Sequence, residues 1–150
     1  MISSETMEKV SQEIWAEERK KRDMALAAYN RKRSQKELEV FTRAKHLCEY
    51  AFRVSCKIPK EYRWNISDRM LNLCLDVVES LHCANDTFDK VEREQLQRKV
   101  DTKLKIFSYV VILAEKNQMF SGKQIKHINT LVHATRQNLW RWIRGVGGGE

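Results

Sequence analysis

Apolar residues recur every three or four positions in four segments between residues 35 and 145. This spacing gathers them on one face of an α-helix, whereas a half-buried strand would show strict alternation. We therefore expect helices over about 35–57, 67–85, 88–118 and 122–144. The expected core positions are Val40, Ala44, Leu47, Ala51, Val54 and Ile58, then Ile66, Met70, Leu73, Val77, Leu81 and Ala84, then Val100, Leu104, Phe107, Val111 and Ala114, and finally Ile125, Ile128, Val132, Thr135, Leu139 and Trp142.

The first two of these helices have unusually wide apolar faces. Beside the main stripe of the first lie Phe41, Cys48 and Phe52. The second is widened by Leu71, Cys74, Leu75 and Val78. Wide faces of this kind are typical of helices that pack in a bundle.

The segment 5–33 has a helical pattern of a different kind. Its centre, residues 17–23, consists of seven consecutive charged residues, and apolar residues occur only toward its two ends. A stripe this thin cannot support a core helix. The segment is a solvated extension or partly disordered arm, or else an arm that docks on a partner. The first interpretation fits the charged middle better, and Trp15 is compatible with both.

Local signals mark where the helices begin and end. Capping boxes, in which a Ser and a Glu or Gln satisfy free backbone amides, begin at Ser34 and Ser121. Pro59 ends the helix before it, because the residue preceding a proline avoids the helical region. Either Ser67 or Asp68 is suited to cap the following helix.

Connections of a few residues, such as the turn and cap expected at 85–87, make neighbouring helices antiparallel. One Pro and five Gly in 150 residues leave few turns for a sheet protein. The sequence thus predicts an all-α protein: an antiparallel up-down-up-down four-helix bundle over residues 35–145. A charged helical extension, 1–34, precedes it, and a flexible Gly-rich tail, 146–150, follows.

Charge is unevenly distributed among these segments. The formal net charge is +8, and residues 120–150 carry five basic residues and one acidic residue, whereas residues 67–88 carry one and four. Such an excess favours RNA, DNA or an acidic protein face as partner. Trp64 and Trp140 lie among the cations, where they could stack on unpaired bases. The predicted nucleic-acid-binding residues are Lys123, Lys126, Arg136, Trp140, Arg141, Arg144, Arg53, Lys57, Lys60 and Arg63.

No catalytic constellation is recognisable, so we expect no enzyme activity and no cofactor. Phosphate-binding loops and nucleophile elbows are missing from the sequence. The Glu-x-x-His pattern, which di-iron bundles carry on two helices, occurs only once, at Glu79 and His82. The four His and four Cys have no metal-ligand spacing, and the Cys usage is typical of a reduced, cytoplasmic protein. No run of about 18 apolar residues predicts a membrane span.

Residues 106–113 are apolar on nearly every side of their helix. A single bundle buries only one side, so this segment predicts a contact between subunits. The expected interface residues are Ile106, Val110 and Leu113, together with Leu71, Leu75 and Val78.

The order of these features resembles a known family. A helix ends at Ile58-Pro59-Lys60, a link with an aromatic and basic residues follows, and residues 66–70, Ile-Ser-Asp-Arg-Met, open the next helix. The chain closes on residues 139–143, Leu-Trp-Arg-Trp-Ile. Over residues 35–145 this resembles the four-helix-bundle family that includes the accessory variability determinant of diversity-generating retroelements and proteins encoded in ribosomal-RNA intervening sequences. Residues 1–34 have no counterpart in the compact family pattern.

The resemblance implies a homopentameric ring with a basic surface, which associates with a reverse transcriptase and its template RNA during mutagenic cDNA synthesis. It implies structural, not catalytic, roles for Pro59, Asp68 and Arg69. Two hypotheses follow. The chain is a non-catalytic retroelement accessory factor, or it is an oligomeric scaffold of the wider family without a nucleic-acid role.

Overall fold

The computed structural model describes residues 3–34 and 38–145, and these ranges contain helices but no strand. The chain divides into two compact units, Met1–Lys36 and Glu37–Glu150. The first contains helix α1 (Ser4–Ser34). The second, here called the helical core, contains α2 (Glu39–Ser55), α3 (Asp68–Asp86), α4 (Lys90–Lys116) and α5 (Gly122–Ile143), with a 3-10 turn, η1 (Lys60–Tyr62), and a π-helical turn, η2 (Arg63–Ser67), between α2 and α3. The predicted all-α class is confirmed.

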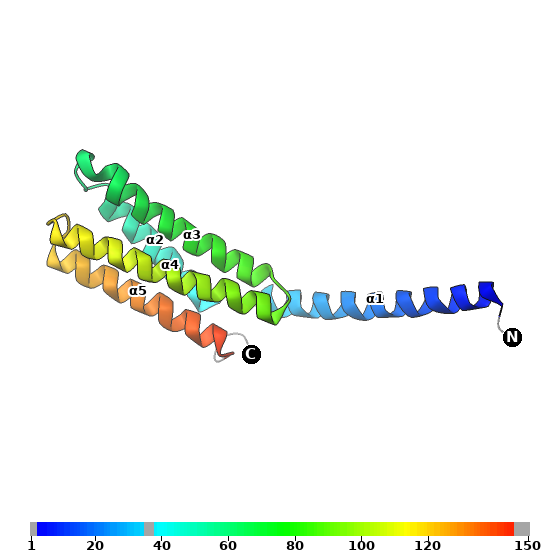
Figure 1. The fold of residues 1–150 in the computed structure, drawn as a ribbon. Helices are drawn as coiled ribbons and strands as arrows, with labels where there is room; N and C mark the ends of the chain where they lie inside the picture. The colour runs from blue at the N-terminus through cyan, green and yellow to red at the C-terminus, as the bar shows by residue number, and fades with distance from the viewer. Residues whose placement is uncertain (1–2, 35–37, 146–150) are drawn as a thin grey trace. The chain divides into compact units, whose positions relative to one another are not determined.

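Helices α2 to α5 enclose one hydrophobic core. Contacts join α2 to α3, α3 to α4, α4 to α5, and α5 back to α2. Consecutive helices lie side by side and run in opposite directions (Figure 1). Each helix therefore has two neighbours, and its apolar face points at the space that all four share.

The residues expected in the core occupy it almost without exception. Every predicted position from Val40 to Leu139 is buried, and the last, Trp142, is half-buried. Two of the residues expected to widen the apolar faces are not buried: Phe52 is 61% exposed and Leu75 is 62% exposed. These two residues lie at the edge of the apolar face.

The helix boundaries show one confirmed cap and two corrections. Ser121 forms the predicted capping box: its Oγ accepts from the backbone amide of Gln124 at 3.2 Å, and Gln124 Oε1 accepts from the amide of Ser121 at 2.8 Å. The cap expected at residues 85–87 lies instead at Asp89, whose side chain accepts from the amide of Glu92. The capping box expected at Ser34 and the Gly-rich tail lie outside the described residues.

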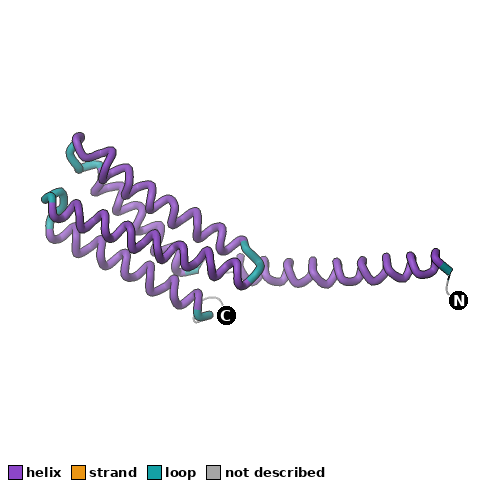
Figure 2. The backbone as a smooth tube through the Cα atoms, viewed as in Figure 1, coloured by secondary structure: helices purple, strands orange, loops and turns teal. Residues whose placement is uncertain are grey.

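Ser67 does not cap α3, because η2 runs directly into that helix and leaves no free turn there. Its buried hydroxyl instead donates to the carbonyl oxygen of Ser55 at 3.2 Å. Ile58 and Ile66 are buried at the two ends of the link. The connection is thus held at both ends, and all the residues between Ile58 and Ile66 are exposed. Figure 2 shows the backbone of this connection at one end of the helical core.

Among the described residues, none of α1 belongs to this core. Its side chains from Glu5 to Ala28 are exposed, and Tyr29 is partly buried. The cause is the pattern expected from the sequence, in which charged residues occupy every face of the helix centre.

Candidate nucleic-acid-binding surface

The predicted basic residues fall at two opposite ends of the helical core. The α2–α3 and α4–α5 connections lie together at one end, and the α3–α4 connection and the end of α5 lie at the other (Figure 1). We call the first the Pro59 end, comprising residues 53–69 and 115–126. At this end lie Arg53, Lys57, Lys60, Arg63, Lys123 and Lys126. At the other end lie Arg136, Trp140, Arg141 and Arg144.

The Pro59 end is strongly basic and carries an unshielded aromatic ring. Its two segments contain eight Lys and Arg against three Asp and Glu. All six of its predicted binding residues are exposed, and Trp64 is 83% exposed, the most of any large apolar side chain in the described residues. Sequence reasoning did not include Lys116 and Arg69, which the fold brings to the same end.

A ring contact brings the beginning of α5 beside α2. The rings of Tyr50 and His127 meet edge to face, with their centroids 4.3 Å apart. Lys126 precedes His127 directly, and Arg53 follows Tyr50 by three residues. The ring contact therefore places the beginning of α5 beside the end of α2 from which Arg53 projects, a juxtaposition that only the helix packing creates.

A shallow groove between α4 and α5 adjoins this surface. It is lined by Glu115 of α4 and by Lys126, Thr130 and His133 of α5, among other residues. Its lining combines a carboxylate, an ammonium group and an imidazole. The groove is open to solvent, so it suits contact with an extended chain better than enclosure of a small substrate.

At the opposite end, a buried carboxylate holds two of the predicted binding residues. Asp101 of α4 is 5% exposed. Its Oδ1 accepts from Arg136 Nε at 2.8 Å and from Trp140 Nε1 at 3.3 Å. Its Oδ2 lies 3.3 Å from Lys105 Nζ. The guanidinium of Arg98 lies over the Trp140 ring, 5.3 Å from the centroid.

These contacts control the ionisation of Asp101. Burial acts to raise its pKa, but the hydrogen bond and charge of Arg136, with Lys105 and Trp140, outweigh burial and bring the pKa below its ordinary value. The carboxylate is therefore charged at neutral pH, and it ties α5 to α4.

Arg136 and Trp140 thus differ from the other predicted binding residues. Both are half-buried and engaged with Asp101, and Arg98 covers one face of the Trp140 ring. Arg141 and Arg144 are exposed. The sequence contains a signal for the contact of Arg136 and Trp140 with Asp101. Arg136 and Trp140 are four residues apart and so share one face of their helix, and Asp101 directly follows a core position of the neighbouring helix.

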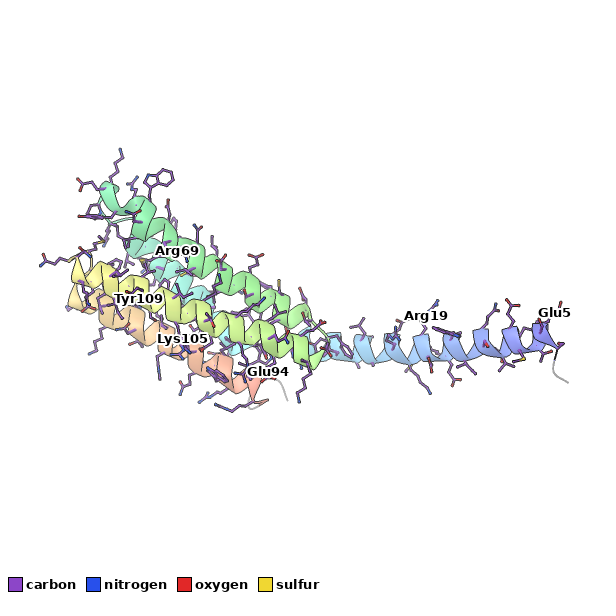
Figure 3. The ribbon with its side chains drawn as sticks, in the orientation of Figure 1. Glu5, Arg19, Arg69, Glu94, Lys105 and Tyr109 are labelled. Carbon is purple, nitrogen blue, oxygen red and sulfur yellow. The ribbon has the colours of Figure 1, made fainter. Side chains whose placement is uncertain are left out.

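The predicted interface residues do not form one surface. Val110 is buried in the chain's own core, at 7% exposure, whereas Ile106 and Leu113 lie on the surface of α4. Beside them are Tyr109 and Ile112, which are also exposed and which sequence reasoning did not name. Tyr109 and Lys105 mark this outer side of α4 in Figure 3.

The α3 members of the predicted interface lie on another side. Leu71, Leu75 and Val78 share a helical stripe with His82, whose ring contacts Phe41 of α2 at 4.8 Å between centroids. Helix α3 meets α4 through Asp76, whose Oδ2 lies 3.5 Å from Lys103 Nζ. The α3 stripe therefore borders α2, and the exposed α4 residues form a separate patch.

Two of the four cysteines contact each other between α2 and α3. All four are unpaired, and Cys48 Sγ donates to the carbonyl oxygen of Cys74 at 3.4 Å. The hydrogen bond with Cys74 outweighs burial and lowers the pKa of the Cys48 thiol. The pKa of the Cys74 thiol is raised by its hydrogen bond with the Cys48 thiol and by the burial of Cys74 itself. Among the described residues, no three His, Cys, Asp or Glu side chains are placed to hold a metal ion.

Comparison of the sequence with protein-family models and with curated proteins finds no match. Within residues 3–34 and 38–145, no helix combines the length and the apolar character needed to cross a membrane.

Proposed function

We propose that this chain is a non-catalytic accessory protein of a diversity-generating retroelement, which binds the template RNA and the reverse transcriptase. In this proposal the helical core is an up-down-up-down four-helix bundle, and its Pro59 end contacts RNA. One observation carries the RNA-binding assignment: the end that carries the exposed ring of Trp64 also carries eight Lys and Arg side chains.

The chemistry of this end fits single-stranded RNA. Cations supply sequence-independent attraction to phosphates, and an exposed aromatic ring supplies a stacking surface for an unpaired base. At the opposite end, Asp101 already neutralises Arg136 and holds the indole of Trp140. Of the two candidate clusters, the Pro59 end therefore has the groups that are available to a ligand.

The polymerase partner rests on the family resemblance over residues 35–145, and the proposed cytoplasmic location rests on the cysteine usage. Two observations are compatible with a ring of copies, the pentamer of the resemblance. The exposed residues of α4 (Ile106, Tyr109, Ile112 and Leu113) and those at the α2–α3 seam (Phe52 and Leu75) form patches on different sides of the core. Contacts between two unlike patches generate rings when the rotation closes.

The RNA-binding assignment is tested by two matched pairs of charge reversals. Lys57→Glu with Arg63→Glu alters the Pro59 end, and Arg141→Glu with Arg144→Glu makes the same charge change at the other end; all four side chains are exposed. Fluorescence anisotropy with a labelled single-stranded RNA measures affinity across a salt series. We expect the first pair to weaken binding by about tenfold or more and to reduce the salt slope, with a much smaller effect of the second.

Equal effects of the two pairs would mean that overall charge, not a site, attracts RNA, and a larger effect of the second pair would move the site. Trp64→Ala separates stacking from charge, because it should lower affinity with no change of salt slope. The accessory role itself fails if the protein binds neither RNA at low salt nor a reverse transcriptase encoded beside its gene.

The scaffold hypothesis remains as a second candidate, and the exposed apolar residues of α4 favour it. A protein that forms a stable oligomer but ignores RNA at low salt would support it. A gene neighbourhood without a reverse transcriptase and a repeated template region would support it too.

A further inference from the structure

Helix α1 keeps its helical form without a core of its own. Within 31 residues it has three Glu-to-Lys or Glu-to-Arg spacings of four residues, at Glu5, Glu17 and Glu18, which stabilise an exposed helix. These spacings explain the helix. They leave unexplained why Val10, Ile14, Met24 and Ala28 follow one another on one face, all exposed to solvent.

The charges of α1 are divided between its two halves. Residues 4–18 contain five Glu and one Lys, whereas residues 19–33 contain seven Lys and Arg and one Asp. Glu5 lies in the acidic half and Arg19 begins the basic half (Figure 3). A helix with this division is complementary to a second copy of itself only when the two run in opposite directions.

We propose that α1 pairs in antiparallel orientation with α1 of a second copy of this chain, aligning Ser4 of one copy with Ser34 of the other. In this register, the numbers of two residues that face each other across the seam add up to 38, as for Ser4 and Ser34. Ile14 faces Met24, Val10 faces Ala28, and Glu17 faces Lys21, each across the helix pair. The spacing of these positions alternates three and four, as the seam of a two-stranded coiled coil requires.

Glu17 and Lys21 lie on the seam itself and determine the orientation. In the antiparallel pair each Glu17 carboxylate meets a Lys21 ammonium, and the central layers contain two such ion pairs. In a parallel pair Glu17 would meet Glu17 and Lys21 would meet Lys21. Polar residues at seam positions select register and direction in this way, at a cost in stability.

The flanking positions beside the seam do not follow the sum of the seam positions, because residues on the same flank of the two helices are neighbours. Glu18 therefore lies near Glu18 of the second copy on one flank, and Lys20 lies near Lys20 on the other. These side chains remain in solvent, where like charges repel only weakly. With two apolar layers on either side of the charged centre, the pairing is reversible and weakens with salt. The basic Pro59 end and the surface of α4 take no part in it.

Orientation is measured by disulfide trapping in the full chain. One preparation carries Ile14→Cys and another Met24→Cys, both with the exposed Cys56 and Cys83 replaced by Ser. Mixed in a glutathione buffer, they should form the 14-to-24 cross-link much faster than either forms a cross-link with itself. A 14-to-14 cross-link as the main product would show parallel pairing and overturn the proposal.

The seam ion pair is tested in the same assay with a matched control. Lys21→Glu places a carboxylate opposite Glu17 at two sites and should slow the 14-to-24 cross-link by about tenfold or more. Arg19→Glu makes the same charge change two residues earlier, on the outer side of the helix, and should have a much smaller effect. The exchange Glu17→Lys with Lys21→Glu restores opposite charges across the seam and should restore the cross-link.

Three results would refute the pairing. They are equal effects of Lys21→Glu and Arg19→Glu, failure of the exchanged variant to recover, and the absence of any cross-link between copies. Circular dichroism of each variant shows that α1 is still helical, so that loss of pairing is not confused with loss of the helix.

Discussion

The buried side chain of Asp101 determines whether two neighbouring side chains, Arg136 and Trp140, are available to a ligand. From sequence, Arg136 and Trp140 read as cationic and aromatic groups open to RNA. In the fold, both donate to the Asp101 carboxylate, at 2.8 and 3.3 Å. A buried carboxylate needs such partners, because desolvation would otherwise make its charged form very costly.

Replacing Asp101 with Asn should lower the free energy of unfolding by about 1–3 kcal/mol at neutral pH, because charge-assisted hydrogen bonds are lost. Chemical denaturation measures this loss. Asp76→Asn is the control: its partner Lys103 is half-exposed and 3.5 Å away, so its loss should cost less than about 1 kcal/mol.

The difference between Asp101→Asn and the natural chain should depend on pH. The folded-state pKa of Asp101 is lowered, so its contribution is complete above the ordinary Asp pKa of about 3.9 and is lost as pH falls below it. Denaturation curves of the two proteins should therefore converge in acid. A difference that stays constant down to pH 3 would contradict the charged role of Asp101.

At the scale of the element, α4 has two apolar sides, of which one is buried in the core and the other is exposed on the surface. Phe107, Val110 and Val111 are buried among the other core helices, whereas Ile106 and Leu113 lie on the surface. At about 100° per residue, Val110 lies nearest to the core side among the predicted interface residues of this helix. The stretch that looked apolar all round is thus divided between folding and a surface contact.

Substitutions on these two sides should have different consequences. Val110→Asp should lower the free energy of unfolding by several kcal/mol, because it buries a charge without a partner. Leu113→Asp should leave the melting temperature nearly unchanged and reduce the mass measured by light scattering. An unchanged mass for Leu113→Asp would remove α4 from the proposed interface.

At the scale of the whole molecule, the core and α1 are built on different principles. The core is held by apolar burial that includes residues from Val40 to Leu139. Helix α1 contributes none of its described residues to that burial and depends on local charge spacing. The apolar stripe of α1 is interrupted by the charged centre and is too thin for a helix that packs in a core.

A chain that begins at Leu38 should therefore unfold as cooperatively as the full chain, with a melting temperature within about 2 °C of it. Its circular dichroism should lose the contribution of the 31 residues of α1. A large fall in melting temperature would show that the core depends on α1.

The helices and the core were predictable from sequence because they depend on local spacing. The stripes from Val40 to Leu139 needed only the helical period, and the Ser121 cap needed only four consecutive residues. Signals that compete locally were less decisive. Ser67 could cap a helix or bond elsewhere, and the π-helical turn before it determined the outcome.

The candidate site required the tertiary structure, because its character depends on which distant residues meet. Sequence alone located the cations. Only packing placed Tyr50 of α2 beside His127 of α5, brought Arg136 to Asp101, and separated the α3 stripe from the exposed side of α4. Helical period determines which face a residue occupies, whereas the neighbour across that face is determined by how four helices share one core.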